Sequence, residues 1–551
     1  MAVTALRVGI AMAAAVSTMA IASVGYAAPE HYPPLLPKST APAPWLTVAP
    51  ATAGKWPLGS RLAAVSLTSA PSATGHGNAI GLNATVRKFI GSPITPGLIR
   101  DIEATLNDRL ARSGRPLLAR WVPADSDSSG VLHFELRQIV LDDIRVTGAA
   151  PAEAAVLKRR LGLAPGAAIS DRELAFDLAA LNRYPFRKVT ARLAPDATGH
   201  GDALSLDVTH TKPWQAYIGF KYAGSDRLTW RRYYAGGTIG GLLGRDSVLA
   251  FQATGSPDVA LHGAREPNFG DLYATYVLPV TRHGVFEANL EGDTFRFTYA
   301  ASKYRILDAL GAVGYRLNVP VKAGQRDIRA GIEARHERTF VTPAAGGTTR
   351  QSAVEVYQVY AGYHVARDRG DGHDDLDMVA HLSPGGMNSG NSSRTYVQYS
   401  DGRETTARYA YLLAAYEGNG RLGTHLTWHS QATVQLSTAA LPFTEQSPLG
   451  GLAYVRGYKL FDGSVDDAAI VRQEIGVYRK AGLAPYLFVD AGWGLDIGAK
   501  HHLVLGAVGM GVTLPLKGDS SLHLDAVHTL CDGDVTPHGV DALEANLAFR
   551  Y

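Results

Sequence analysis

Short segments in which apolar and polar residues alternate fill the chain from residue 214 to residue 551. An alternation with a period of two places successive side chains on opposite faces of a β-strand. In the last segment, 541–551, Leu543 and Phe549 fall on one face and Glu544 falls on the other. The pattern therefore predicts that this part of the chain is entirely β.

We expect sixteen strands here, an even number that brings both ends of a closed sheet to the same side. The second face of the segments is polar and rich in glycine, as expected where one face meets lipid and the other lines an aqueous lumen. A soluble β-sandwich, with its apolar face turned inward, is the alternative. The strands are expected at 214–223, 228–238, 247–254, 271–280, 284–294, 308–320, 326–340, 354–367, 374–384, 405–416, 425–437, 468–480, 484–494, 502–515, 520–529 and 541–551.

Residues 61–140 mix two periodicities and predict a small α+β module. Residues 62–67 and 131–140 alternate as strands. Between them, Thr95 and Pro96 have the form of a helix start, with threonine as the cap and proline in the first turn. Apolar residues then recur every four positions on one helix face, at Leu98, Ile102, Leu106 and Leu110.

Residues 141–212 predict a second module in the order strand, helix, helix, strand, strand. Ser170 and Glu173 have the spacing of a capping box at the start of the second helix. The strands are expected at 141–146, 189–193 and 204–208, and the first helix at 152–161. The predicted fold class is thus a membrane all-β barrel of sixteen antiparallel strands (213–551) preceded by two small α+β modules.

The N-terminal 60 residues predict no folded domain. Residues 1–27 have the form of a secretory signal, because Arg7 precedes an apolar stretch at 8–24 that ends in small residues. A membrane helix is the alternative. Residues 28–60 are rich in proline and alanine and are expected to form an extended arm or linker. Beyond the signal, the sequence contains no apolar run of about 18 residues, which is the length that would predict a helix spanning the membrane.

Composition excludes several function classes. The 53 basic and 50 acidic residues nearly balance and form no basic patch for nucleic acid. The single cysteine, Cys531, makes no internal disulfide, which argues against a disulfide scaffold for an exported protein. Motifs for zinc hydrolases, dithiol chemistry and serine hydrolases are absent, and the calcium-loop-like residues 371–375 lack the closing glutamate. We expect no enzyme activity, no cofactor and no metal.

Three motifs resemble those of the two-partner-secretion transporters of the haemolysin-activator type (ShlB/FhaC/HecB), within the outer-membrane assembly superfamily. Residues 181–185 and the following 189–195 are similar to the family's second POTRA module. Residues 450–459 contain a VRGY motif, formed by Val455, Arg456, Gly457 and Tyr458, in a loop expected near 439–467. Residues 485–492 are similar to the family's F-x-D-x-G strand, with Phe488, Asp490 and Gly492. The resemblance covers residues 61–551.

The resemblance implies that the VRGY loop folds into the barrel lumen and that Arg456 meets Asp490 on the inner wall. An arginine that loses water needs a partner, and its planar fork suits a carboxylate. Gly457 would let the backbone turn tightly or approach the wall. The alternative is that Arg456 and Asp490 are exposed and unrelated.

The resemblance also implies that the POTRA modules receive an unfolded secreted exoprotein in the periplasm. A sheet edge can bind such a client by adding its strand, and the expected edge is Lys188, Val189, Thr190, Ala191, Arg192 and Leu193. Charges on an edge also prevent aggregation, which is the alternative role for Lys188 and Arg192.

Phe549 and Tyr551 at the C-terminus are expected to act as a signal for the barrel-assembly machinery, or as plain anchors in the aromatic girdle. The implied function is secretion of an exoprotein client through a monomeric barrel set in outer-membrane lipid. The alternatives are a factor that inserts other barrels, a passive porin, and an outer-membrane hydrolase.

Overall fold

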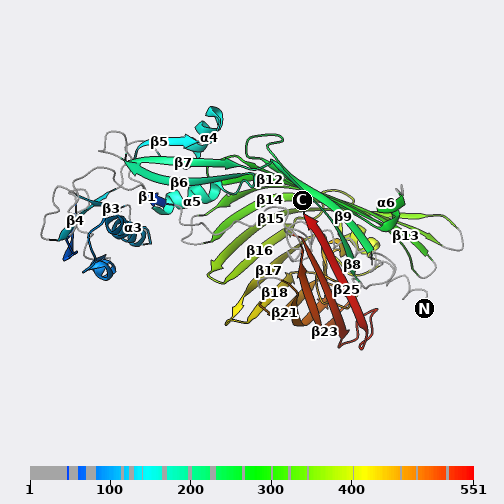
Figure 1. Ribbon diagram of the computed structural model, residues 1–551. Coiled ribbons are helices and arrows are strands. Elements are labelled where there is room, and N and C mark those ends of the chain that lie inside the picture. The colour runs from blue at the N-terminus through cyan, green and yellow to red at the C-terminus, as the bar shows by residue number, and fades with distance from the viewer. Residues whose placement is uncertain are drawn as a thin grey trace. The chain divides into compact units, whose positions relative to one another are not determined.

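The computed structural model describes residues 46–48, 60–69, 82–112, 117–122, 130–138, 141–163, 171–195, 202–223, 231–262, 267–299, 302–319, 324–343, 347–400, 402–459, 462–478, 482–516 and 520–550. These residues fall into two compact units, one with the N-terminal sheets and one with a closed barrel (Figure 1). The expected signal, at 1–27, lies outside the described residues.

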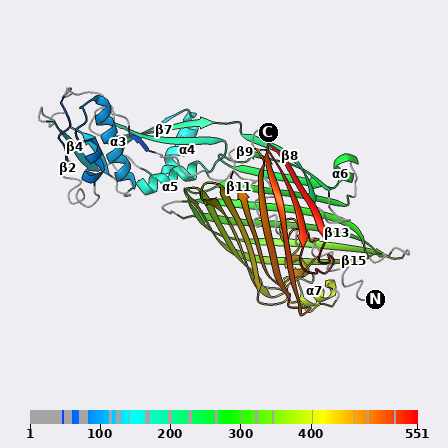
Figure 2. The ribbon, with the colours of Figure 1, turned by 60° about the horizontal axis from the view of Figure 1, so that its bottom comes forward.

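The first α+β module contains a three-stranded sheet in the order β2-β4-β3. Helix α3 lies along this sheet (Figure 2) and begins as predicted, because the Leu98 N–H donates to Thr95 Oγ1 at 3.1 Å. The sequence did not predict α2, η3 and β3. The elements are β2 (Ala64–Ser69), α2 (Leu82–Val86), η3 (Arg87–Phe89), α3 (Pro96–Arg112), β3 (Leu117–Trp121) and β4 (Val131–Gln138).

Glu103 of α3 lies in this core at 6% exposure, and burial raises its pKa to about 7. In the unfolded chain this carboxyl loses its proton near pH 4.5, whereas in the folded module it keeps the proton up to about pH 7. The free energy of unfolding therefore falls as the pH rises from about 4.5 to 7, by up to about 3 kcal/mol. We expect Glu103→Gln to slow amide exchange of β3 and β4 at pH 8 and to change it little at pH 5. A pH dependence identical to the wild type would contradict this assignment.

The second module has the predicted order of elements, and β6 is paired on both sides in a sheet ordered β1-β6-β7-β5. The outer strand, β1, comes from the proline-rich arm and runs parallel to β6. Ser170, the expected cap of the second helix, lies outside the described residues. The elements are β1 (Leu46–Val48), β5 (Leu141–Thr147), α4 (Pro151–Leu161), α5 (Asp171–Leu181), β6 (Arg187–Pro195) and β7 (Asp202–His210).

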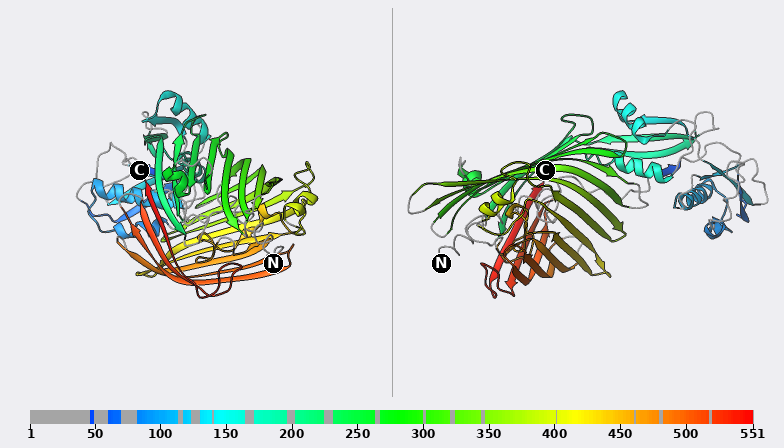
Figure 3. Two further views of the ribbon diagram at one scale, coloured as in Figure 1. Left: turned by 90° about the vertical axis from the view of Figure 1, so that its right-hand side faces the viewer. Right: turned by 180° about the vertical axis from the view of Figure 1, so that it is seen from behind.

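Sixteen antiparallel strands close the barrel, which confirms the predicted fold class. The last strand pairs with the first, so that the colours of Figure 3 run from green through yellow to red and return to green. The strands are β8 (Trp214–Ala223), β9 (Arg231–Gly240), β10 (Val248–Gly255), β11 (Phe269–Pro279), β12 (Gly284–Tyr299), β13 (Ser302–Asn318), β14 (Gln325–Pro343), β15 (Arg350–Arg369), β16 (Gly372–Ser383), β17 (Tyr409–Leu422), β18 (Leu426–Ser437), β21 (Asp467–Val477), β22 (Ala484–Asp496), β23 (His501–Pro515), β24 (Ser521–Thr529) and β25 (Asp541–Arg550).

The alternation along these strands separates an outer apolar face from an inner polar one. Leu290 and Leu543 are 65% and 70% exposed, whereas the next residues, Glu291 and Glu544, are each 5% exposed. Apolar residues therefore face the lipid side and carboxylates face the lumen. None of the helices in the described segments is both long and apolar enough to span a membrane.

Connections between the strands carry the remaining elements. The connection between β18 and β21 contains the VRGY tetrapeptide, and we call its residues 438–466 the VRGY loop. The short elements in the barrel connections are α6 (Pro257–His262), α7 (Ser393–Tyr399), η5 (Phe443–Glu445), β19 (Ser447–Pro448) and β20 (Ser464–Val465). Strands β19 and β20 pair with each other, so the VRGY loop is a structured hairpin.

Candidate functional site

The VRGY loop packs against the inward faces of the last barrel strands. Val455, Arg456 and Tyr458 are 0%, 1% and 2% exposed. Val455 and Tyr458 join a buried apolar cluster with residues of β21 to β24. An arginine with so little exposure needs charged partners within the protein, because water is excluded from its guanidinium group.

Arg456 finds its main partner in Asp490 of β22, and the structure brings the two predicted residues together. Its Nε donates to Asp490 Oδ2 at 2.7 Å and its Nη2 donates to Oδ1 at 2.8 Å. The backbone N–H of Arg456 also donates to Asp490 Oδ2, at 3.2 Å. Because the guanidinium and carboxylate planes match, the two parallel hydrogen bonds fix the direction of the loop as well as its position.

Two further acids and an aromatic ring complete the surroundings of Arg456. Its Nη1 donates to Glu474 Oε1 at 2.7 Å and lies 3.5 Å from Asp525 Oδ2. Its Cζ lies 3.5 Å from the ring centroid of Phe488, a cation–π contact. Phe488 and Asp490 of the F-x-D-x-G strand therefore contact the same guanidinium group from two sides.

The glycines of the two motifs allow this close approach. A Cβ on Gly492 would lie 2.8 Å from Val455 Cγ2, and a Cβ on Gly457 would lie 2.8 Å from Val527 Cγ1. The Tyr458 hydroxyl donates to the carbonyl oxygens of Gly506 and Cys531, with both distances at 2.8 Å. Each residue of the VRGY tetrapeptide thus has its own contact on the wall.

Gly457→Ala is expected to destabilise the docked loop by about 1–3 kcal/mol, because Gly457 has φ +82° and its new methyl group would collide with Val527. Gly482→Ala is the matched control, since Gly482 has φ +84° but open space around its Cβ position. The measurement is thermolysin cleavage of the VRGY loop in the purified barrel. Equal cleavage of the two variants would show that the contact with Val527 has no effect.

A second buried ion cluster holds the base of the VRGY loop, and sequence reasoning missed it. Arg403, in the connection after α7, donates through Nη2 to Asp466 Oδ2 at 2.5 Å and through Nε to Asp496 Oδ1 at 2.8 Å. Asp466 also accepts from the N–H groups of Leu441 and Ile497, at 2.9 and 2.7 Å. Asp466 is completely buried, so the cluster ties both ends of the loop to β22.

The predicted client-binding edge is already occupied in the structure. The side chain of Asn182 accepts from the Val189 N–H at 2.7 Å and donates to the Val189 carbonyl oxygen at 2.9 Å. Beyond it, Ala191, Arg192 and Leu193 pair with β1. Lys188, Thr190 and Arg192 are exposed, and Arg192 forms an ion pair with Asp207 at 3.0 Å. A client can add a strand along β6 only after these partners leave.

Phe549 is 46% exposed on the lipid side of β25, as expected for an aromatic girdle residue. Tyr551 lies outside the described residues. The role of this terminus as an assembly signal stays a prediction.

Residues 386–514 match the model of a family described as "Haemolysin secretion/activation protein ShlB/FhaC/HecB". The matched range contains the VRGY loop and the F-x-D-x-G strand. The predicted family resemblance is confirmed. By its description, the matched family acts in the secretion and activation of haemolysin. No curated protein matches the chain.

Solved structures agree with the family assignment at the level of the fold. CdiB from Escherichia coli aligns with a TM-score of 0.62 and 17% identity, over 90% of this chain and 91% of that chain. CdiB from Acinetobacter baumannii aligns with a TM-score of 0.61 and 13% identity, over 99% of both chains. BamA from Haemophilus ducreyi lacking POTRA domains 1–3 aligns with a TM-score of 0.57 and 13% identity, over 89% of this chain and 100% of that chain.

Proposed function

We propose that this protein is an outer-membrane translocator that captures an unfolded exoprotein in the periplasm and secretes it through its barrel. The observation that carries the proposal is the bidentate ion pair between Arg456 and Asp490. It holds a loop of the ShlB/FhaC/HecB-matching region inside the lumen. A rigid porin needs no such loop, whereas a gated path needs a part that can hold two positions.

The same ion pair can serve as a latch. Buried ions are stable only while each keeps its partners, because desolvation is costly. When a client chain and water enter the lumen, Arg456 and Asp490 regain solvation and their separation costs less. Since the periplasm supplies no nucleotide, the driving force would come from folding of the client outside the cell.

The experiment that tests this function begins with a search of the genes beside that of this chain for a large protein with a secretory signal, which then serves as the candidate exoprotein. The exoprotein is expressed with and without this barrel in a host that lacks both, and its exposure on the cell surface is measured by protease accessibility. Secretion that depends on the barrel is the expected result. Equal exposure without the barrel would overturn the proposal.

Client capture is proposed to occur along β6 of the second module, after β1 has left. Thr47→Pro removes the backbone N–H of β1 opposite Arg192, so it should weaken this pairing. We expect the variant to bind the unfolded N-terminal segment of the exoprotein roughly threefold to tenfold more tightly, as judged by titration calorimetry, since less pairing must be broken. Unchanged affinity would exclude this edge as the client site.

A second candidate function is the insertion of other barrels into the outer membrane, because the fold also resembles BamA. The two functions differ in what is lost when the protein is removed. Removal of a translocator lowers only the surface amount of its exoprotein, whereas removal of an insertion factor lowers the amounts of many unrelated outer-membrane barrels.

A further inference from the structure

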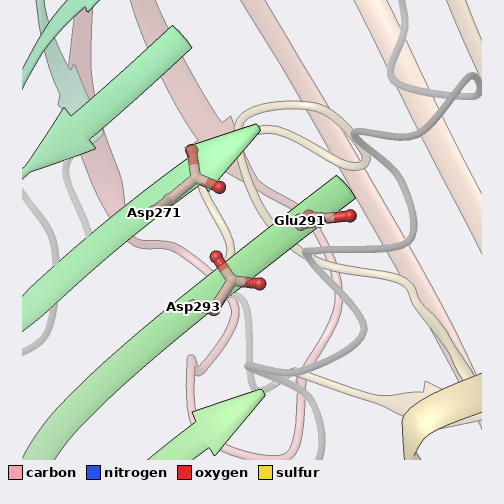
Figure 4. Close-up of side chains that lie close together, drawn as sticks. All are labelled: Asp271, Glu291 and Asp293. Atoms are coloured by element: carbon pink, nitrogen blue, oxygen red, sulfur yellow. The ribbon is translucent and has the colours of Figure 1, made fainter. Parts of the chain in front are cut away.

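A group of carboxylates on the inner wall of the barrel lies apart from the VRGY loop partners. Asp271 belongs to β11, and Glu291 and Asp293 belong to β12 (Figure 4). Asp271 and Asp293 stand directly opposite each other in the register of the two strands. One carboxylate oxygen from each of the three residues lies within 4.8 Å of those from the other two. A single ion could contact all three.

Burial makes this arrangement costly for the protein alone. Glu291 and Asp293 are 5% and 7% exposed. Like charges directly opposite each other destabilise a sheet, and a buried carboxylate without a partner costs several kcal/mol. Asp293 Oδ2 accepts no hydrogen bond. Positive charge placed between the carboxylates would offset both costs.

The next strand extends the row of buried carboxylates that surrounds Asp293, whose Oδ2 has no hydrogen-bond partner. Asp308 of β13 lies directly opposite Asp293 and is 4% exposed. Neither of its carboxylate oxygens accepts a hydrogen bond. Because directly opposite residues share a face of the sheet, Asp308 extends the same row of carboxylates on the lumen side.

Positively charged side chains act on three of the four carboxylates, including Glu291, on which Arg335 acts. Lys221 of β8 and Arg232 of β9 act on Asp271, and Arg335 Nη1 lies 3.7 Å from Asp308 Oδ2. At the centre, the strongest charges acting on Asp293 are those of other carboxylates. Asp293 is therefore the carboxylate of the row on which negative charges act most strongly.

We propose that Asp271, Glu291 and Asp293 bind one Ca²⁺ ion on the inner wall of the barrel. Ligands that are all oxygen atoms favour a hard divalent cation. Ca²⁺ accepts irregular and flexible oxygen coordination with about six to eight ligands, whereas Mg²⁺ demands a near-ideal octahedron and keeps several waters. The proposal goes beyond protein secretion, since the ion would join β11 to β12 and reduce the negative charge that the lumen presents.

The test uses the full chain refolded in detergent without lipopolysaccharide, so that lipid phosphates contribute no calcium binding. After treatment with EDTA and its removal, CaCl₂ is titrated in a calorimeter. Asp293→Asn and Glu291→Gln keep the side-chain shapes and each remove one charged ligand. Both are expected to weaken calcium binding at least about tenfold, because affinity follows the charge of the ligand set.

Glu287→Gln is the matched control, because Glu287 lies on the inner face of the same strand but pairs with Arg316 at 2.7 Å. It should bind calcium within about twofold of the wild type. Folding of each variant is checked by its mobility on unheated gels, and Glu291→Gln decides the outcome if Asp293→Asn does not fold. Absence of calcium binding at millimolar concentration, equal loss in the control, or tighter binding of Mg²⁺ would overturn the proposal.

Discussion

Secretion of the exoprotein client is expected to fall more than about tenfold when Arg456 is replaced by alanine, while the amount of folded barrel stays unchanged. The substitution leaves Asp490 buried without its two charge-assisted hydrogen bonds, and it removes the hydrogen bond that Arg456 donates to Glu474 at 2.7 Å. Removing one member of a buried ion pair costs about 3–5 kcal/mol, which is enough to release the docked loop. The measurement is surface-exposed client relative to barrel on the same gel.

Two further variants distinguish the bidentate pairing of Arg456 from its positive charge alone, and from a general disturbance of the lumen. Arg456→Lys keeps the charge but cannot form two parallel hydrogen bonds with Asp490, so it should behave like alanine. Arg329→Ala removes another arginine of the inner wall, one that pairs with Asp377 of β16 at 2.8 Å. It should secrete normally. Normal secretion by both Arg456 variants would mean that the docked loop has no part in transport.

Asp466→Ala is expected to release the base of the VRGY loop while the contact between Arg456 and Asp490 remains possible. Asp466 accepts hydrogen bonds from Arg403 and from the N–H groups of Leu441 and Ile497. Each buried hydrogen bond to a charged group is worth about 1.5–3 kcal/mol, so their joint loss exceeds what the short β19–β20 hairpin can restore. We therefore expect the hairpin to become accessible.

The measurement is the rate of maleimide labelling at a cysteine placed at Ser447, which is 5% exposed, in a Cys531→Ser background. Labelling should be at least about tenfold faster with Asp466→Ala, in line with a loss of more than 1.4 kcal/mol. Asp377→Ala, which removes a lumenal acid remote from the loop, should leave the rate unchanged. A protected Ser447 position in Asp466→Ala would show that the tip alone holds the loop.

The strand pattern could be predicted from the sequence because alternation is local. A residue such as Leu290 shows its face through its neighbours at positions 288 and 292, so no distant contact is needed to place it toward lipid. The start of α3 could be predicted in the same way, since the Thr95 hydroxyl caps the helix by accepting from an N–H group only three residues away. Helix α2 and strand β3 were missed because each is short and neither carries a strong periodicity.

Contacts between distant residues were beyond local patterns. Family resemblance suggested that Arg456 meets Asp490, 34 residues away. Arg403 and Asp466 are 63 residues apart and belong to no recognised motif, so no sequence pattern predicted their ion pair. The pairing of β1 with β6 was hidden for the same reason, because proline-rich composition indicates an extended chain without naming the edge that it covers.

The sequence by itself determined the alternating faces, the number of strands and hence the closed barrel. The reason is that every second side chain of a strand lies on the same face, so the apolar residues alternate along the sequence. Only the tertiary structure decided which charges share a site. Carboxylates at positions 271 and 293 become direct neighbours through strand register, and a one-residue shift in that register would turn one set of side chains from the lumen to the lipid. Register and loop docking depend on the closed sheet as a whole, which is why the ion clusters became visible only in three dimensions.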